Sequence, residues 1–263
     1  MATFYTSAIL TTDDLERSTE HSKHVRARES RVRYYQEAGR LLPIRRGLYA
    51  VVPENSEPST FRVDPFLIAA SLAPDAVLAY HTALEFHGKT YSSFHEFHTL
   101  SRHTVRPFRF QSQRFRILKF PQTLLRQHEE TFGIQETQRE GVTVRVTSFE
   151  RTLVDVLHRP DIAGGWEEVW RSLESIEFVD VEQVIRYASL LQNGRTCAAV
   201  GFYLEQHRET LMIEDAMLEP LRKRRPKVPQ YFDRSARKGG KLVSGWNLLV
   251  PPVVLERSWE EPT

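Results

Sequence analysis

The N-terminal part of the chain contains the stretch LLPIRRGLYAVV at residues 41–52, in which two short apolar runs flank Arg45, Arg46 and Gly47. Two such runs joined by a short segment with glycine are typical of a β-hairpin. Arginine at a hairpin tip can bind a phosphate group well, because the guanidinium group donates hydrogen bonds as a planar fork. The stretch therefore predicts a hairpin with a cationic tip.

The residues before this hairpin predict two helices. Thr12 precedes Asp13 and Asp14, which is the pattern of a hydroxyl N-cap followed by acids in the first turn. A second helix is expected from Ser22, or from Ser30 if it is shorter, and Gly39 would end it. Its apolar side recurs near helical spacing, at Val25, Val32, Tyr35 and Ala38. The basic side chains that point away from this side are Lys23, Arg26, Arg31 and Arg33.

Two helices followed by a cationic hairpin is the order of a winged helix-turn-helix domain. In such domains a helix enters the major groove of DNA, and phosphate contacts fix its orientation. We therefore expect DNA contacts from the second helix and the hairpin, with Arg40 at the helix end. The full expected set is Lys23, Arg26, Arg31, Arg33, Arg40, Arg45 and Arg46. The alternative is a small module that uses the hairpin for protein contact.

The distribution of charge supports a polyanion partner more than the net charge does. The net charge of the 263-residue chain is only +2. Residues 17–46 nevertheless hold nine basic and three acidic side chains, residues 101–119 hold six basic and no acidic ones, and residues 222–241 hold nine basic ones against Asp233 alone. Clustered cations attract polyanions even when the net charge is small, although solvated surface is the plainer explanation of any one run.

The sequence predicts two domains and an α+β fold. Residues 53–59, PENSEPS, form a polar stretch with two prolines, which indicates a linker. It separates a winged helix-turn-helix domain at residues 1–53 from a larger mixed α+β domain at residues 61–263. In the second domain, helices are expected at 66–72, 79–87, 149–157, 166–173, 181–191 and 195–207. Strands are expected at 94–100, 115–120, 142–146, 228–231 and 242–250, without the strict alternation of an α/β fold.

Composition excludes several classes of protein. No apolar run approaches the roughly 20 residues of a membrane helix, and the N-terminus lacks the pattern of a signal peptide. The single cysteine, Cys197, excludes an intrachain disulfide and a cysteine-rich zinc site, and its apolar neighbours indicate packing. No glycine-rich phosphate loop or nucleophile elbow occurs. We therefore expect a cytoplasmic protein with no catalytic residue, metal or cofactor.

A metal-dependent, nuclease-like enzyme is the alternative function that the sequence leaves open. His81 and Glu85 are four residues apart on an expected helix, and Glu150 and Asp155 lie on another. Such residues can ligate a metal, but the spacing matches no established zinc motif. The structural alternative is that His81 and His87 pack at helix ends, while Arg151 and Asp155 form a common surface ion pair. A third possibility is a protein-interaction module whose basic tracts bind an acidic partner.

A second nucleic-acid or partner surface is possible near the C-terminus. Tyr231 and Phe232 follow a basic cluster and offer stacking surfaces. The cluster comprises Arg222, Lys223, Arg224, Arg225 and Lys227. A solvated loop between a helix and a strand would explain the same charges.

Five segments, in this order, resemble the AbiEi family of antitoxins, which are described as transcriptional regulators of viral-defence, or type IV toxin–antitoxin, systems. They are GRLLPIRRGLY at 39–49, AYHTALEFHG at 79–88, VRVTSFERTLVD at 144–155, RPDIAGG at 159–165 and WN at 246–247. The resemblance spans about residues 12–251. It implies an N-terminal winged helix that binds double-stranded DNA at its own promoter and represses its own operon. It also implies a C-terminal domain that counteracts a nucleotidyltransferase-like toxin without needing a stable complex, and no catalytic residue.

Overall fold

The computed structural model describes residues 7–17, 25–232 and 239–256. The chain forms two compact units, and each unit is assembled from separate stretches of sequence. The first unit comprises Met1–Leu78, His95–Lys119 and Gln135–Val146, and the second comprises Ala79–Phe94, Phe120–Ile134 and Thr147–Thr263. The linker expected at residues 53–59 lies inside the first unit, so the division into residues 1–53 and 61–263 stays a prediction.

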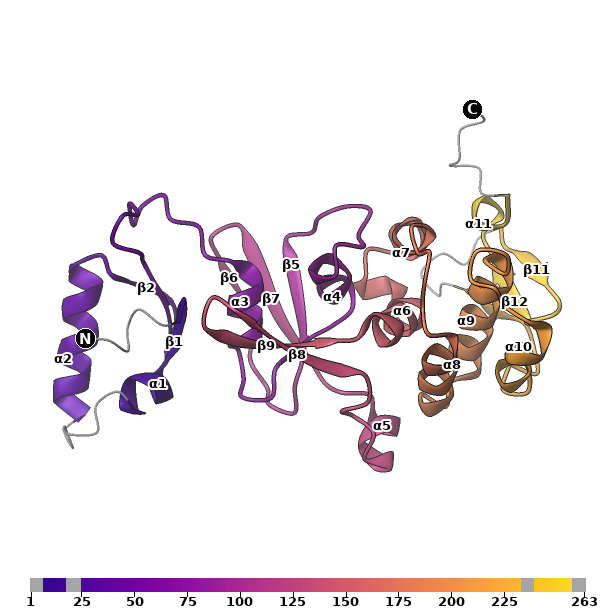
Figure 1. Ribbon diagram of the computed structural model, residues 1–263, viewed down its shortest axis with the longest axis horizontal. Coiled ribbons are helices and arrows are strands. Elements are labelled where there is room, and N and C mark those ends of the chain that lie inside the picture. The colour runs from indigo at the N-terminus through magenta and orange to yellow at the C-terminus, as the bar shows by residue number, and fades with distance from the viewer. Residues whose placement is uncertain (1–6, 18–24, 233–238, 257–263) are drawn as a thin grey trace. The chain divides into compact units, whose positions relative to one another are not determined.

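The N-terminal part of the first unit packs two helices against a small antiparallel sheet (Figure 1). Its elements are β1 (Ile9–Thr11), α1 (Thr12–Arg17), α2 (Val25–Glu37), β2 (Leu41–Arg45) and β3 (Leu48–Val51). The sheet has the order β1-β3-β2. Val32 and Tyr35 of α2 pack on the buried pair Leu10 and Leu41. The two expected helices and the hairpin are therefore present among the described residues.

Two expected helix caps need correction. Thr11, not Thr12, caps α1: its Oγ1 accepts a hydrogen bond from the Asp14 amide at 3.2 Å, and the Asp14 carboxylate accepts from the Thr11 amide at 2.9 Å. This is the reciprocal pattern of a capping box. Ser30 lies inside α2 rather than at its start, and Ser22 lies outside the described residues. The expected end of α2 is confirmed, because Gly39 adopts φ +69° and the Arg40 amide donates to the Tyr35 carbonyl.

The rest of the first unit is a mixed sheet with strand order β6-β7-β5-β4-β9-β8 among the described residues. The strands are β4 (Val77–Leu78), β5 (Glu96–Leu100), β6 (Phe108–Phe110), β7 (Gln113–Leu118), β8 (Ile134–Arg139) and β9 (Val142–Thr147). Helix α3 (Pro65–Ala70) covers one face of the sheet: Phe66 packs edge-on against Phe97, and the Thr99 hydroxyl donates to the Ala69 carbonyl. Asp64 caps α3 by accepting from the Phe66 amide.

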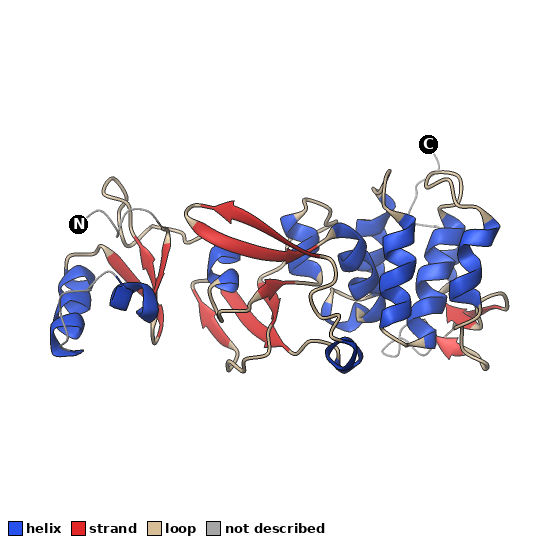
Figure 2. Ribbon diagram, turned by 60° about the horizontal axis from the view of Figure 1, so that its bottom comes forward, coloured by secondary structure: helices blue, strands red, loops and turns tan. Residues whose placement is uncertain are grey.

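The second unit is mainly helical, and most of its helices pack side by side (Figure 2). They are α4 (His81–Phe86), α5 (Gln122–Gln127), α6 (Phe149–His158), α7 (Trp166–Glu174), α8 (Val181–Leu190), α9 (Gly194–Gln206), α10 (Asp215–Arg222) and α11 (Pro252–Glu256), with a 3-10 turn at Pro160–Ile162. Ser148, Asp180 and Asn193 cap α6, α8 and α9 with their side chains. Trp170, Tyr203 and Trp246 lie in its core.

A small sheet with the order β10-β12-β11 completes the second unit. The strand expected at 242–250 is instead a hairpin, with β11 (Lys241–Val243) and β12 (Leu248–Val250) joined by a turn in which Asn247 adopts φ +51°. The strand expected at 228–231 is shortened to β10 (Gln230–Tyr231). Together the two units bear out the expectation of a mixed α+β fold.

No helix in the described part of the chain is long and apolar enough to span a membrane.

Candidate nucleic-acid interface

Helix α2 presents a polar side to solvent. Because Val32 and Tyr35 face the small sheet, the residues between and beyond them project outward at helical spacing. Arg31 and Arg33 are exposed, as is Tyr34. Arg26 lies on the same helix with its side chain outside the described part, and Lys23 lies outside the described residues.

The guanidinium group of Arg33 forms an ion pair on the helix surface. Its Nε lies 2.9 Å from the Glu37 carboxylate, one turn further along α2, and the two side chains are 80% and 65% exposed. An exposed pair of this kind stabilises a helix by only about 0.3–0.5 kcal/mol. Arg33 can therefore exchange Glu37 for a phosphate group at little cost.

The turn of the β2–β3 hairpin is held against the start of α1. Gly47 adopts φ +80°, which side chains rarely tolerate, and a Cβ there would lie 2.7 Å from the Thr12 hydroxyl. The Thr12 amide donates to the Gly47 carbonyl at 3.0 Å. These contacts hold Arg46, which is exposed at the turn, on a backbone that is fixed before any ligand binds.

Helix α2 and the hairpin turn meet in a cavity of about 320 Å³, which we call the arginine groove. From α2 it is lined by Glu29, Val32, Arg33 and Gln36, and from the rest of the module by Thr12, Arg46, Gly47 and Tyr49. Two expected DNA-contacting residues, Arg33 and Arg46, thus share one concave surface although they are 13 positions apart in the sequence. Glu29 is the acidic side chain that opposes them there.

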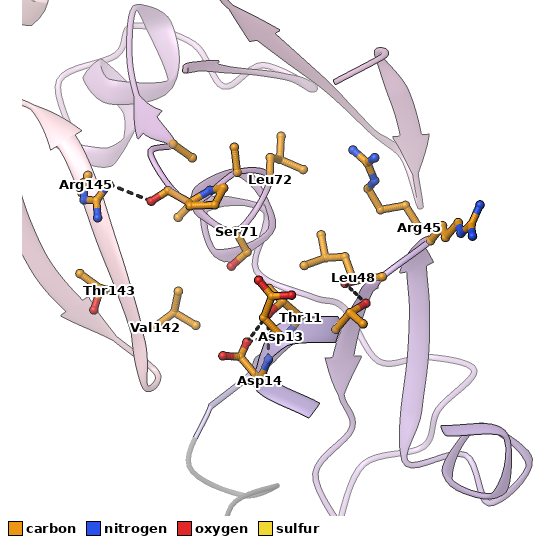
Figure 3. Close-up of a pocket in the computed structure, with 17 residues that line it drawn as sticks. Thr11, Asp13, Asp14, Arg45, Leu48, Ser71, Leu72, Val142, Thr143 and Arg145 are labelled. Carbon is orange, nitrogen blue, oxygen red and sulfur yellow. Dashed lines mark hydrogen bonds between the residues drawn. The ribbon is translucent and has the colours of Figure 1, made fainter. Parts of the chain in front are cut away.

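Arg45 has a different environment from its neighbour Arg46. Its guanidinium carbon lies 5.5 Å from the centre of the Phe108 ring, and its Nη1 is buried and makes no hydrogen bond in the described structure. Arg45 and Arg46 also line a larger cavity of about 670 Å³. In Figure 3, Thr11 at the end of β1 and Asp13 and Asp14 at the start of α1 lie between Leu48 on one side and Val142 and Thr143 of β9 on the other. This cavity is lined by acidic side chains as well as by arginines, which include Arg145. Its charge therefore does not favour a polyanion over other ligands.

Arg40, the residue expected to add a phosphate contact, lies just after α2. Its Nη2 is 3.5 Å from a Glu54 oxygen, and both side chains are at least one-third exposed. The geometry thus places Arg40 in a weak surface pair outside the arginine groove.

The basic run at residues 101–119 lies on β6, β7 and the adjoining loops. Arg109 and Arg114 are directly opposite each other on these antiparallel strands. The Nε of Arg114 is 3.8 Å from a Glu96 oxygen. Two arginines against one glutamate leave this edge of the sheet cationic, although like charges in directly opposed positions repel each other.

The C-terminal basic cluster divides into one neutralised arginine and several exposed cations. Arg222 contacts the carboxylates of Asp215, Glu205 and Glu219 at 2.9–3.2 Å, and it lies 5.5 Å from the Trp246 ring. The bidentate contact with Arg222 helps to lower the pKa of Asp215 to about 2. Lys223, Arg224, Arg225 and Lys227 are exposed. An open cavity of about 510 Å³, which we call the basic depression, is lined by Glu219, Arg222, Lys223, Arg225, Pro226, Lys227 and Asn247.

One of the two expected stacking residues is unsuitable. Phe232 is fully buried, 1% exposed, and packs edge-on against Trp170. Tyr231 is exposed. The difference follows from the strand, because neighbouring side chains of β10 and the residue after it point to opposite faces.

The alternative metal site receives no support from the geometry. Among the described residues, no group of three or more His, Cys, Asp or Glu side chains is placed to hold a metal ion. His81 stacks on Phe94 at 3.8 Å, and its Nε2 lies 3.2 Å from Glu168 instead of reaching Glu150 or Asp155. Its other ring nitrogen is 4.0 Å from Glu85. Burial lowers the pKa of His81 although Glu168 opposes that effect.

His87 packs at the end of a helix, which was the alternative to a role in metal binding. Its Nε2 lies 2.8 Å from the Thr147 carbonyl, and its ring packs edge-on against Phe149. Together with His81, it therefore serves packing and hydrogen bonding at the ends of α4.

Arg151 and Asp155 form the expected i,i+4 pair, but the pair is buried rather than on the surface. The side chains are 0% and 1% exposed, with 3.5 Å between Nε and the carboxylate. The Tyr187 hydroxyl donates to Asp155 at 2.7 Å, and Arg151 donates to the carbonyls of Glu130 and Phe132. Burial raises the pKa of Asp155, an effect that Arg151 and Tyr187 oppose. This pair therefore anchors α6 in the core and cannot serve as an open metal site.

Of the residues that line the arginine groove, the sequence had pointed only to Arg33 and Arg46 as contacts, and it missed others such as Gln36 and Tyr49. Gln36 is three positions after Arg33 on α2, so helical spacing alone could have placed them on one side. Tyr49 belongs to β3, and no sequence spacing relates it to α2. Its position in the groove depends on the packing of α2 against the sheet.

Comparisons with known proteins show a shared fold. No protein-family model matches the chain, and no curated protein sequence matches it. A crystal structure of the protein RV2827C from Mycobacterium tuberculosis is similar, with a TM-score of 0.63 and 16% sequence identity over 97% of this chain and 90% of that chain. This likeness shows that the two proteins have the same fold over nearly their whole length.

Proposed function

We propose that this protein is a DNA-binding transcriptional regulator of the AbiEi antitoxin type, in which residues 1–53 form a winged helix-turn-helix domain that represses its own promoter. The observation that carries the proposal is the arginine groove, in which Arg33 of α2 and Arg46 of the hairpin turn share one concave surface. Both side chains are exposed, and both come from elements that winged-helix proteins use to contact DNA.

The arrangement of the N-terminal elements supports this proposal. A strand, two helices and a hairpin follow one another, and β1 pairs with β3 so that the hairpin becomes part of a three-stranded sheet. Gly47 and Thr12 hold the turn in place. A fixed turn loses little conformational entropy when a phosphate binds, which favours binding.

The remaining parts of the proposal rest on the AbiEi-like segments at 79–88 and 144–155. They support a non-enzymatic C-terminal domain, residues 61–263, that counteracts a nucleotidyltransferase-like toxin in the cytoplasm. Both segments form well-packed structure: four of the six residues of α4 and seven of the ten residues of α6 are buried. Co-expression with a neighbouring toxin of that class should restore growth, and a full-length protein that fails to restore growth would remove the antitoxin role without affecting DNA binding.

The test of DNA binding is a gel shift on the DNA upstream of the protein's own gene, with scrambled competitor, over a series of salt concentrations. Each lost phosphate contact reduces the slope of log K against log salt by ~0.9. The double variant Arg33→Gln/Arg46→Gln should therefore weaken binding and reduce the slope by ~1.8.

The matched control is Arg186→Gln, which removes an exposed arginine of α8 in the second unit. It should leave affinity and slope unchanged. Absence of a specific complex with any upstream fragment would refute the proposal. An unchanged slope in the double variant would remove the arginine groove from it.

A further inference from the structure

The small sheet of the second unit exposes an apolar row on one face. Tyr231 of β10 and Leu242 of β11 are both register partners of Leu249 on the central strand β12, so the three side chains lie side by side on the same face. Tyr231 is 36% exposed and Leu242 is 52% exposed. The neighbouring residues of β12, Leu248 and Val250, point to the opposite face and are fully buried. The exposed face therefore offers an aromatic ring to a ligand.

The basic depression lies beside this sheet and carries cations that the protein does not neutralise. Arg222 is occupied by three carboxylates, and one of these, Glu219, is the only acidic side chain among the described residues that line the depression. Lys223, Arg225 and Lys227 are exposed and form no ion pair within the described structure. Many other surface arginines, such as Arg139, are paired with a carboxylate. The depression thus has an uncompensated positive charge.

The loop that carries these cations is held in a fixed conformation. A Cβ at Gly194, at the start of α9, would lie 2.9 Å from the Arg224 carbonyl, so the loop approaches α9 as closely as glycine permits. The Asn247 side chain donates to the Pro226 carbonyl at 2.8 Å. The Asn247 carbonyl accepts from the Gln230 amide at 2.9 Å. Asn247 therefore hydrogen-bonds both to the loop of the depression and to β10, the strand that carries Tyr231.

We propose that this surface binds single-stranded nucleic acid, with phosphate groups on Lys223, Arg225 and Lys227 and a base stacked on Tyr231. A cationic groove next to an exposed aromatic ring is the arrangement by which proteins bind single strands without reading base pairs. A duplex buries its bases and would leave the ring unused. The site belongs to the second unit and the arginine groove to the first, so the proposal does not rest on the proposed function.

The test measures the anisotropy of a fluorescein-labelled oligouridylate, and of the matching single-stranded DNA, with the full chain. The triple variant Lys223→Gln/Arg225→Gln/Lys227→Gln should weaken binding and reduce the salt slope by about two, at ~0.7 for each contact with a single strand. Tyr231→Leu should weaken binding about tenfold, whereas Tyr231→Phe should bind as the wild type does, because stacking needs the ring and not the hydroxyl. Thermal melting of each variant checks that it is folded.

The control is Arg186→Gln, which removes an exposed arginine of α8 and should bind the oligonucleotide as the wild type does. The proposal is overturned if the wild type does not bind or if the triple variant binds equally well. It is also overturned if the variant Arg33→Gln/Arg46→Gln no longer binds the oligonucleotide, because the binding would then belong to the arginine groove. Tyr231→Leu with wild-type affinity would also overturn it. Binding of a polyglutamate peptide in place of the oligonucleotide, with the same dependence on the three cations, would overturn it and assign the surface to an acidic protein.

Discussion

The carboxylate of Glu168 is the centre of a buried hydrogen-bond cluster that predicts a pH-dependent loss of stability. Glu168 lies on α7 and is 8% exposed. It accepts hydrogen bonds from the Ser92 amide at 3.0 Å, the Ser92 hydroxyl, the Ser172 hydroxyl at 3.1 Å and the Nε2–H of His81 at 3.2 Å. Burial opposes ionisation of Glu168, but these donors outweigh it and lower its pKa below the ordinary value.

The substitution Glu168→Gln keeps the shape of the side chain and removes its charge. A hydrogen bond to an ionised group contributes about 1 kcal/mol more than one between neutral groups. Glutamine keeps one acceptor oxygen, so we expect a loss of about 2–3 kcal/mol near neutral pH. For a chain of this size that corresponds to a decrease in Tm of about 5–10 °C.

The pH dependence follows from the direction of the pKa shift. Because the folded pKa of Glu168 is lowered, its contribution is present above the ordinary value of 4.5 and is lost as pH falls through the folded pKa. The stability difference between wild type and Glu168→Gln should therefore shrink in acid. His81, whose folded pKa is also lowered, adds a loss of stability in both proteins below its ordinary value of 6.5, because the unfolded chain binds that proton more readily.

Urea midpoints of the two proteins, measured near pH 7 and again in the acid range, check this reasoning. The control is Glu167→Gln, one residue earlier on α7, where the side chain is 55% exposed and pairs with Arg171. It should change stability by no more than about 0.5 kcal/mol. Equal midpoints for the two variants, or a difference between wild type and Glu168→Gln that does not change with pH, would refute the argument.

Three further predictions concern glycine positions and the cysteine. Gly47→Ala forces φ +80° on alanine and crowds the Thr12 hydroxyl, so it should cost about 1–2 kcal/mol and speed hydrogen exchange of the β2–β3 amides; unchanged exchange would contradict it. Gly201→Ala would overlap the buried ring of Trp246. It should lower the free energy of unfolding by about 3 kcal/mol, measured as a lower urea midpoint, and a wild-type midpoint would disprove that packing. Burial raises the pKa of Cys197 to about 11, so mass spectrometry should detect alkylation near pH 8 only after unfolding.

Features that depend on residues close in sequence were predictable. The stretch at 41–52 forms the expected hairpin because alternating apolar residues and a glycine turn act over a few positions. The helix expected at 149–157 is α6, and its cap Ser148 precedes it directly. Val32 and Tyr35 were placed on the buried side of α2 by helical spacing alone. Short strands such as β4 and β6, of two and three residues, had too few positions to show any period.

The charged residues show why the candidate sites were less predictable than the helices. Arg45 and Arg46 are adjacent, yet one packs over Phe108 and the other is exposed at the turn. Arg222 and Lys223 are adjacent, yet of these two only Arg222 is neutralised, by carboxylates that include Glu205, 17 positions away. The ion pair expected on the surface, Arg151 and Asp155, is buried because Tyr187 of α8 covers it.

The sequence by itself determined the type and order of the main helices, the N-terminal hairpin and the segregation of positive charge. These properties follow from interactions within one or two turns of the chain. Only the tertiary structure decided which cations are free, that Arg33 and Arg46 line one groove, and that Tyr231 rather than Phe232 faces solvent. Those outcomes depend on which distant segments pack against a side chain, and packing excludes water and supplies partners in a way that local spacing does not encode.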